Sequence, residues 1–323
     1  IIAANYTIAS NLSACSLTVN NNANVTVNSG VNVTLNGPLT VSSGSFTLNN
    51  NANLIQTTNV NNSGNIIVKR ESSPLMRLDY SLWSSPVVSQ KLLDFSPLTT
   101  TTRFYTYNTP TNLYGAVLDP STTNFADGQG YLIRMPNTHP TTPTIWNGSF
   151  SGVPHNGYYP ITMTNSGATK RFNLVGNPYP SPISMSQFVA DNNTKITGTL
   201  YFWRKTNGAG TAYCTWAGGT FVTNSNTQTV NPNGIIQTGQ GFFVEALNAS
   251  TTLQFNNGQR VSNTTGQFFK TKQLVSHRST LWLNASNSSG DFSQMAITYF
   301  DGATLGVDAF DGKYFNDSPV ALT

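Results

Sequence analysis

Short triplets with apolar outer residues recur through the first seventy positions and set the first structural expectation. They read LTV at 17, VTV at 25, VTL at 33, LTV at 39, FTL at 46, LIQ at 54 and IIV at 66. The alternation is typical of strands that bury every second side chain. Leu17 matches Leu39, and Val25 matches Phe46, about 21 residues further on. Three triplets per period predict a short parallel β-solenoid over residues 1–71.

The segments between the triplets are rich in Asn, Ser and Gly, and they fit the corners of such a solenoid. Asn and Gly accept left-handed backbone conformations, and stacked Asn side chains can hydrogen-bond from coil to coil. The period continues from Leu39 to Val60 and from Phe46 to Ile66. Residues 1–68 carry no Asp, Glu, Lys, Arg or His, as expected where like charges would repeat every ~4.8 Å. A flexible linker would not need apolar residues in register.

Beyond Ser72 the strands lengthen, and two tracts repeat the same landmarks in the same order. The first reads YSLWSSPV (80–87), RFYTYN (103–108), ADGQGYLIRM (126–135) and PTIWNGSFSGV (143–153). The second reads FNLVGNPYPSPI (172–183), LYFWRK (200–205), QTGQGFFVEA (237–246) and TLQFNNGQRV (252–261). The chain is therefore predicted to be all-β, with a duplicated β-sandwich-like unit over 72–270. Its copies span about 77–153 and 171–262.

Each copy carries one Gly-Gln-Gly, which could hold a phosphate or turn the chain. A phosphate loop leads from a strand into the N-terminus of a helix. Both copies continue instead with alternating strand sequence, YLIRM and FFVEA, so we predict a tight turn into a core strand. Arg134 and Glu245 occupy equivalent positions on these strands. Opposite charges at equivalent positions favour a structural or outward-facing role over a catalytic one.

The proline-rich stretch LVGNPYPSPI is expected to leave a strand and run extended along a surface, because proline removes backbone donors. The following ISMSQFVADN predicts a short helix capped by Ser184 or Ser186. Tyr179 and Phe188 are expected to cover the edge of the β unit, where packing is the usual role of aromatic side chains.

The last region, 271–323, contains the strand-like segments STLWLNAS and FSQMAITYF, which predict an antiparallel hairpin. They either start a further β domain or pack back onto the preceding unit. Asp308, Asp311 and Asp317 follow closely in sequence. Such oxygen ligands could bind calcium, although no glutamate closes an EF-hand loop. The alternative is a solvated Asp-Gly turn region, and no other cofactor is expected.

Composition narrows the classes of function. Charged residues make up 9% of the chain, against roughly 25% in ordinary soluble domains, and the 16 Lys and Arg are scattered. A nucleic-acid-binding face is therefore not expected. The histidines have no metal-ligand spacing, no GxSxG occurs, and Glu71 and Glu245 are the two glutamates. We therefore expect no enzymatic activity. No apolar run approaches the ~20 residues of a transmembrane helix, and the start at Ile1 resembles a processed product.

The cysteines and tryptophans supply further candidates. Cys15 shares the parity of Leu17, which predicts a buried thiol, and a long-range disulfide with Cys214 is the alternative outside the cytoplasm. Trp146 and Trp216 each lie beside Gly, Asn or Ala. They are the candidates for an exposed platform that stacks on sugar rings, against the more common buried role.

A series of motifs carries a family resemblance. The motifs LWSSPV, FADGQGYLIRMPN, FNLVGNPYPSPI, LYFWRKTNG, GQGFFVEA and LWLNAS…GDFSQMAITYFDGATLGVD occur in this order. From about residue 15 to the end the chain resembles large surface proteins exported by the type IX secretion system, many of them from gliding bacteria. The resemblance implies a secreted or cell-surface location, often adhesion, and contact with the outer-membrane secretion machinery during export. This sequence contains neither a signal peptide nor the C-terminal sorting domain of that pattern.

These observations together lead us to expect an extracellular, non-enzymatic protein of the bacterial cell surface, an adhesin or display module. Its expected partners are surface glycans or solid substrata, contacted through many weak interactions. The alternative is a carbohydrate-binding accessory module of a secreted polysaccharide-degrading enzyme.

Overall fold

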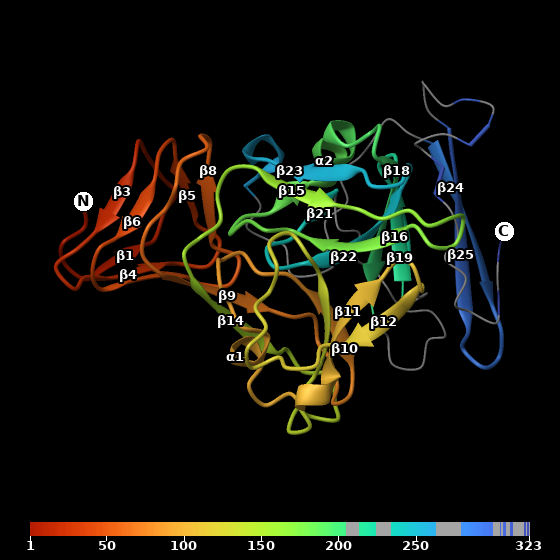
Figure 1. Ribbon diagram of the computed structural model, residues 1–323, viewed down its shortest axis with the longest axis horizontal. Coiled ribbons are helices and arrows are strands. Elements are labelled where there is room, and N and C mark those ends of the chain that lie inside the picture. Colours follow the sequence, from red (N-terminus) through yellow and green to blue (C-terminus); the bar gives the residue numbers. More distant parts are fainter. Residues whose placement is uncertain are drawn as a thin grey trace.

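The fold is nearly all β. The computed structural model describes residues 1–204, 213–223, 234–262 and 279–299, with Thr304, Gly306, Val307, Asp311, Gly312, Val320 and Leu322. Within these residues the helices are α1 (Leu92–Phe95) and α2 (Met185–Asp191) and two 3-10 turns, η1 (Thr101–Arg103) and η2 (Asn257–Gln259). Figure 1 shows a solenoid at one end, two packed sheets in the middle and a hairpin at the other end.

The first seventy residues form the predicted parallel β-solenoid. Its strands are β1 (Tyr6–Ile8), β2 (Leu12–Ala14), β3 (Leu17–Val19), β4 (Asn24–Val27), β5 (Asn32–Leu35), β6 (Leu39–Val41), β7 (Ser45–Leu48), β8 (Asn53–Gln56) and β9 (Ile66–Glu71). Every third strand pairs in parallel up to β8, and β9 pairs with β7 because the intervening position is only a single bridge at Ser63, which gives the orders β1-β4-β7-β9, β2-β5-β8 and β3-β6. Three faces thus wind around a single apolar interior.

The predicted register holds for the first coils and fails once. Leu17 pairs with Leu39, and Val25 pairs with Phe46. The match of Leu39 to Val60 is wrong, because the neighbouring Thr40 bridges to Ser63 instead. The corner after β8 is longer than the preceding ones, so the residue that pairs with Thr40 comes later in the sequence than the period predicts. At this corner the Asn62 side chain accepts a hydrogen bond from the Leu39 amide at 2.8 Å.

Asparagine side chains connect successive coils, as the sequence predicts. Asn53 donates to Asn32 Oδ1 at 2.9 Å, and the amide of Asn32 donates to Asn11 Oδ1 at 2.9 Å. At the corners, Asn21 and Asn51 adopt φ values of 53° and 64°. Asn tolerates this left-handed region better than most residues, which explains why the corners are rich in it.

The two predicted copies form sheets whose first four strands follow an equivalent order. The first contains β10 (Tyr80–Trp83), β11 (Phe104–Asn108), β12 (Leu113–Ala116), β13 (Tyr131–Arg134) and β14 (Asn147–Gly152). The second contains β16 (Phe172–Gly176), β17 (Ile183–Ser184), β18 (Ile196–Trp203), β19 (Tyr213–Ala217), β20 (Thr220–Val222), β21 (Ile235–Ile236) and β22 (Gly241–Ala246). The sheets read β10-β13-β11-β12 and β16-β22-β18-β19-β20, while β15 (Tyr159–Thr162) pairs with β23 (Thr252–Phe255).

The Gly-Gln-Gly motifs form turns that lead into β13 and β22, as predicted, and they also connect the copies. The amide of Ser84 donates to Gly239 O, and the amide of Gly176 donates to Gly128 O, both at 2.9 Å. Gly128 and Gly239 take φ values of 68° and 73°. Each turn therefore contacts the end of the first strand of the other copy, in a reciprocal arrangement with approximate two-fold symmetry.

Aromatic residues at equivalent positions fill the space between the two sheets. Leu82 and Leu174 belong to this cluster, together with the buried Tyr201 and Phe243. The hydroxyl groups of Tyr114 and Tyr213 meet at 2.9 Å. The two copies thus face each other through matching surfaces.

A larger apolar core joins the solenoid to both copies. It includes Val33 of the solenoid, Trp83 of the first copy and Phe242 of the second. Strand β14 pairs antiparallel with β9, with Ser149 opposite Lys69. The sheet of the solenoid therefore continues into the first copy without a break.

The proline-rich stretch after β16 is buried, so the expectation of a surface course is wrong. Residues 176–183 are all buried, and the carbonyl of Pro180 accepts a hydrogen bond from the amide of Leu54 in the solenoid at 2.9 Å. The Asn177 side chain donates to Ser181 O at 2.8 Å. Side chains and the solenoid provide hydrogen-bond partners for the backbone of this segment. The segment can therefore lie buried between the solenoid and the second copy.

The predicted helix and hairpin are both present. Helix α2 begins after Ser184, whose hydroxyl accepts a hydrogen bond from the Gln187 amide at 3.2 Å. Strands β24 (Ser279–Ser286) and β25 (Phe292–Tyr299) form the antiparallel hairpin. The hairpin packs back on the second copy, where Thr220 and Thr298 join their hydroxyls at 3.0 Å (Figure 1).

Candidate functional site

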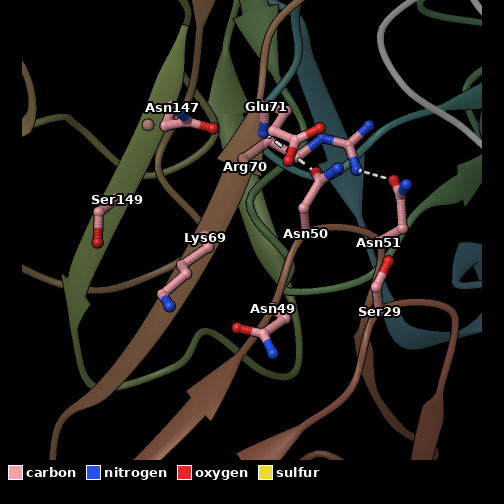
Figure 2. A pocket seen from close by; sticks show the side chains of 10 residues that line it. Ser29, Asn49, Asn50, Asn51, Lys69, Arg70, Glu71, Asn147 and Ser149 are labelled. Atoms are coloured by element: carbon pink, nitrogen blue, oxygen red, sulfur yellow. Dashed lines mark hydrogen bonds between the residues drawn. The ribbon is translucent and has the colours of Figure 1, made fainter. Parts of the chain in front are cut away.

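An open polar groove of about 730 Å³ lies where the solenoid meets strand β14. Figure 2 shows that β9, β14, the corner before β8 and Ser29 in the corner after β4 supply its side chains. The lining residues are Ser29, Asn49, Asn50, Asn51, Lys69, Arg70, Glu71, Asn147, Gly148 and Ser149. Its size is within the usual range of small-molecule sites, about 300–1,000 Å³.

The solenoid repeat explains why these residues meet. Ser29 and Asn50, 21 positions apart, lie at the same corner of successive coils, and β9, paired in parallel with β7, brings Lys69, Arg70 and Glu71 alongside that corner. On β9 the alternation of side chains exposes Lys69 and buries Arg70. Strand β14 then adds Asn147 opposite Glu71.

Buried Arg70 fixes the inner wall of the groove. Its guanidinium donates to Asn51 Oδ1 at 2.6 Å and to Gln237 Oε1 at 3.4 Å. Burial lowers the pKa of Arg70 to about 9, although Glu71 acts in the opposite direction. The Glu71 amide donates to Asn50 Oδ1 at 3.0 Å. These hydrogen bonds fix the side chains of Asn50 and Asn51 at the corner.

The open side of the groove offers neutral hydrogen-bonding groups around one exposed ammonium. Lys69, Asn147 and Ser149 are exposed, and Figure 2 shows Lys69 and Ser149 directed away from the Arg70 guanidinium. Amides and hydroxyls can donate and accept at the same time. Glu71 is the single carboxylate among the lining residues, whereas glycoside hydrolysis requires a pair. The arrangement suits binding of a polyhydroxylated ligand.

The predicted tryptophan platform is not formed as expected. Trp216 is 3% exposed, because β19 directs it inward together with Cys214, so an exposed role for Trp216 is wrong. Trp146 is half-buried, and its ring packs edge-on against Trp83 and Phe95 at centroid distances of 5.4 and 5.1 Å. Neither ring lies in the groove lining.

Of the three aspartates predicted as calcium ligands, the described residues include only Asp311. Asp311 accepts a hydrogen bond from Thr199 through its backbone carbonyl at 3.3 Å, whereas Asp308 and Asp317 lie outside the described residues. Within the described part of the chain, no three His, Cys, Asp or Glu side chains are grouped as metal ligands. Calcium binding in the tail stays a prediction.

Other candidate side chains have structural surroundings. Glu245 is 1% exposed and forms an ion pair with Arg171, which confirms a structural role and makes the outward-facing alternative wrong. Its counterpart Arg134 donates to Asn137 Oδ1 at 2.6 Å. Cys15 and Cys214 do not form a disulfide with each other. Cys15 is exposed, contrary to expectation, because the corner after β2 breaks its parity with Leu17.

Sequence reasoning did not identify the groove. The available signal was that the first charged residues of the chain, Lys69, Arg70 and Glu71, follow directly after 68 uncharged positions. What could not be read was the pairing of β14 with β9, which brings Asn147 and Ser149 alongside.

Comparisons with known proteins place the chain in a family. Residues 2–323 match the family described as a domain of unknown function (DUF8693), and the chain belongs to it. No curated protein matches the chain, and no solved structure matches it. None of the helices in the described residues is long and apolar enough to cross a membrane.

Proposed function

We propose that this protein is a non-enzymatic module of the bacterial cell surface that attaches to glycans through the groove lined by β9, β14 and the adjoining solenoid corners. The observation that carries the proposal is the lining itself, in which amide and hydroxyl groups surround one exposed ammonium on a rigid scaffold. A wide, shallow site gives a weak single contact, and display of many copies on a surface turns weak contacts into avidity.

The test is binding of the purified chain to a panel of soluble neutral and acidic oligosaccharides, measured by calorimetry. A double substitution of Asn147→Ala and Ser149→Ala removes two exposed hydrogen-bonding groups of the groove. Ser186→Ala on α2 is the matched control, because Ser186 is exposed and outside the groove lining. Binding that is lost in the groove variant and kept in the control supports the proposal; a panel without any ligand refutes it.

The cellular part of the proposal is surface location through type IX secretion, and it rests on the resemblance of the ordered motifs. Fractionation of cells with and without a functional secretion system tests it directly. We expect the protein at the surface of the intact strain and its retention inside the secretion-defective one. Equal surface amounts in both strains would contradict this route.

The same groove would serve an accessory module of a polysaccharide-degrading enzyme, which is the second candidate. The open lining, with its amide, hydroxyl and ammonium groups, favours both candidates equally at the level of binding. A deletion strain separates them. Loss of attachment with unchanged polysaccharide breakdown supports the adhesin, whereas slower breakdown with normal attachment supports the accessory module.

A further inference from the structure

The groove is continuous with a regular polar face on the outside of the sheet β1-β4-β7-β9-β14. One row of outward side chains crosses the strands through Thr7, Thr26, Thr47, Ile67 and Ser151, each opposite the next in the pairing register. None of these five side chains is fully buried. The sheet thus presents hydroxyls at nearly every strand, with one step per coil.

A second row runs parallel to the first and enters the groove. Asn28 and Asn49 follow the paired residues Val27 and Leu48, and Lys69 lies opposite Ser149. Adjacent strands are about 4.8 Å apart, so both rows repeat at that spacing along the solenoid axis. An extended sugar chain repeats its rings at a similar length, so that successive rings could meet successive strands.

The charge on this track is concentrated at one point. Lys69 is exposed, and no carboxylate of the described residues forms an ion pair with it. Arg70 lies buried beneath, and Glu71 is partly buried at the far end of the groove. These three residues give a net charge of +1 (two cations and one carboxylate) beside 68 uncharged positions. An exposed ammonium among neutral groups matches a carboxylate carried on a polyhydroxylated chain.

We infer that the ligand is an extended, uronate-containing polysaccharide that lies across strands β4, β7, β9 and β14, with a carboxylate at the Lys69 ammonium. This inference rests on the proposed function, because it names the ligand class of the same groove. The rows of Thr and Asn side chains contact the sugar hydroxyls on either side, and Lys69 selects the acidic chain over the neutral one.

The experiment compares oligomannuronates of increasing length with manno-oligosaccharides of the same linkage, which differ in having a hydroxymethyl group in place of the carboxylate. We expect affinity for the acidic series to rise with length and to fall with added salt. Lys69→Gln should weaken binding of the acidic oligomers about tenfold and leave the neutral ones unchanged. Thr26→Val with Thr47→Val keeps the β-branched shape and should weaken the long oligomers more than the short ones.

The outcomes separate this inference from the function on which it rests. Equal binding of acidic and neutral oligomers, unaffected by Lys69→Gln, would overturn the uronate assignment. Affinity that does not change with length, or with the threonine substitutions, would overturn the extended track while groove binding stands. Absence of binding to every oligosaccharide would refute the proposed function as well. Equal melting temperatures establish that each variant is folded.

Discussion

Arg260 connects the solenoid with several distant segments of the chain. Its guanidinium donates to Leu54 O of the solenoid, to Asn156 Oδ1 at 2.9 Å and to Ser181 Oγ at 2.9 Å. It also lies over the ring of Tyr179, 4.8 Å from the centroid. Burial lowers its pKa to about 10, so the side chain stays charged at neutral pH and its acceptors stay satisfied.

Removal of Arg260 should therefore be costly. We expect Arg260→Ala to lower the free energy of unfolding by about 3 kcal/mol or more, because several buried acceptors lose their donor. Chemical denaturation measures the loss. Arg260→Lys keeps the charge but lacks the planar fork, so it should recover only part of the stability. A change below about 0.5 kcal/mol in the Ala variant would contradict the importance of these bonds.

Asp127 gives the protein a pH-dependent contact. Its Oδ1 lies 3.0 Å from His155 Nε2, and His155 Nδ1 lies 2.9 Å from Pro178 O. The hydrogen bond from His155 lowers the pKa of Asp127, with burial acting in the opposite direction. A carboxyl whose pKa is lower in the folded state stabilises the fold above its unfolded pKa, and the contribution is lost as pH falls through the folded value.

Substitution of Asp127 should change the acid limb of the stability profile. Asp127→Asn should be less stable than the parent at neutral pH, and the difference should shrink as pH falls below about 4. Thermal melting across this pH range is the measurement. Asp94→Asn on α1 is the control, since Asp94 is exposed and should leave the profile unchanged. Parallel profiles for Asp127→Asn and the parent would contradict the prediction.

The corners of the solenoid leave little room for larger side chains. Gly44 takes φ +87°, and a Cβ there would lie 2.1 Å from the backbone oxygen of Ala23 in the preceding coil. Coils at the spacing of paired strands leave no room for a side chain at this point. Gly167 has a positive φ of 125° as well, but nothing lies within 4 Å of its Cβ position.

These two glycines form a matched test of corner packing. We expect Gly44→Ala to cost more than about 2 kcal/mol, from backbone strain together with the clash. Gly167→Ala carries the strain alone and should cost about 1 kcal/mol. Urea denaturation of both variants measures the difference. Equal losses would mean that the coils move apart freely at this corner.

At the level of elements, the sequence predicts strands better than it predicts their surroundings. The triplets predict the solenoid strands because apolar alternation and the repeat period depend on residues close together in sequence. The shared order of motifs predicts the equivalent strands of the two copies. Burial of the stretch 176–183 and of Trp216 depends on partners far away in sequence. The groove belongs to the same class, because it requires Lys69 and Ser149 to meet through a pairing across 80 positions.

The continuous core makes the described molecule a single packed body. Leu54 is fully buried in the solenoid and belongs to the same apolar cluster as Trp83. The five tryptophans all lie beyond residue 72. Tryptophan fluorescence therefore reports on the copies and the hairpin, and it responds to the solenoid only if the units unfold together.

We expect Leu54→Ala to destabilise the protein by about 2–5 kcal/mol and to shift the tryptophan-detected transition by the full amount. Circular dichroism, which also follows the solenoid strands, should give the same midpoint, as a two-state transition requires. Val244→Ala in the core of the second copy is the companion variant. A tryptophan transition that is unaffected by Leu54→Ala would show that the solenoid unfolds independently.

The reciprocal contact of the Gly-Gln-Gly turns has a consequence for the ancestry of the protein. Each copy contains both partners of this contact, the turn whose carbonyl accepts the hydrogen bond and the strand end whose amide donates it. A half-length polypeptide with one copy would therefore carry a self-complementary surface, and two such polypeptides could associate as a homodimer. Fusion of the two genes would then have made permanent an assembly that already existed, and freed one half to acquire the ion pair that the other lacks.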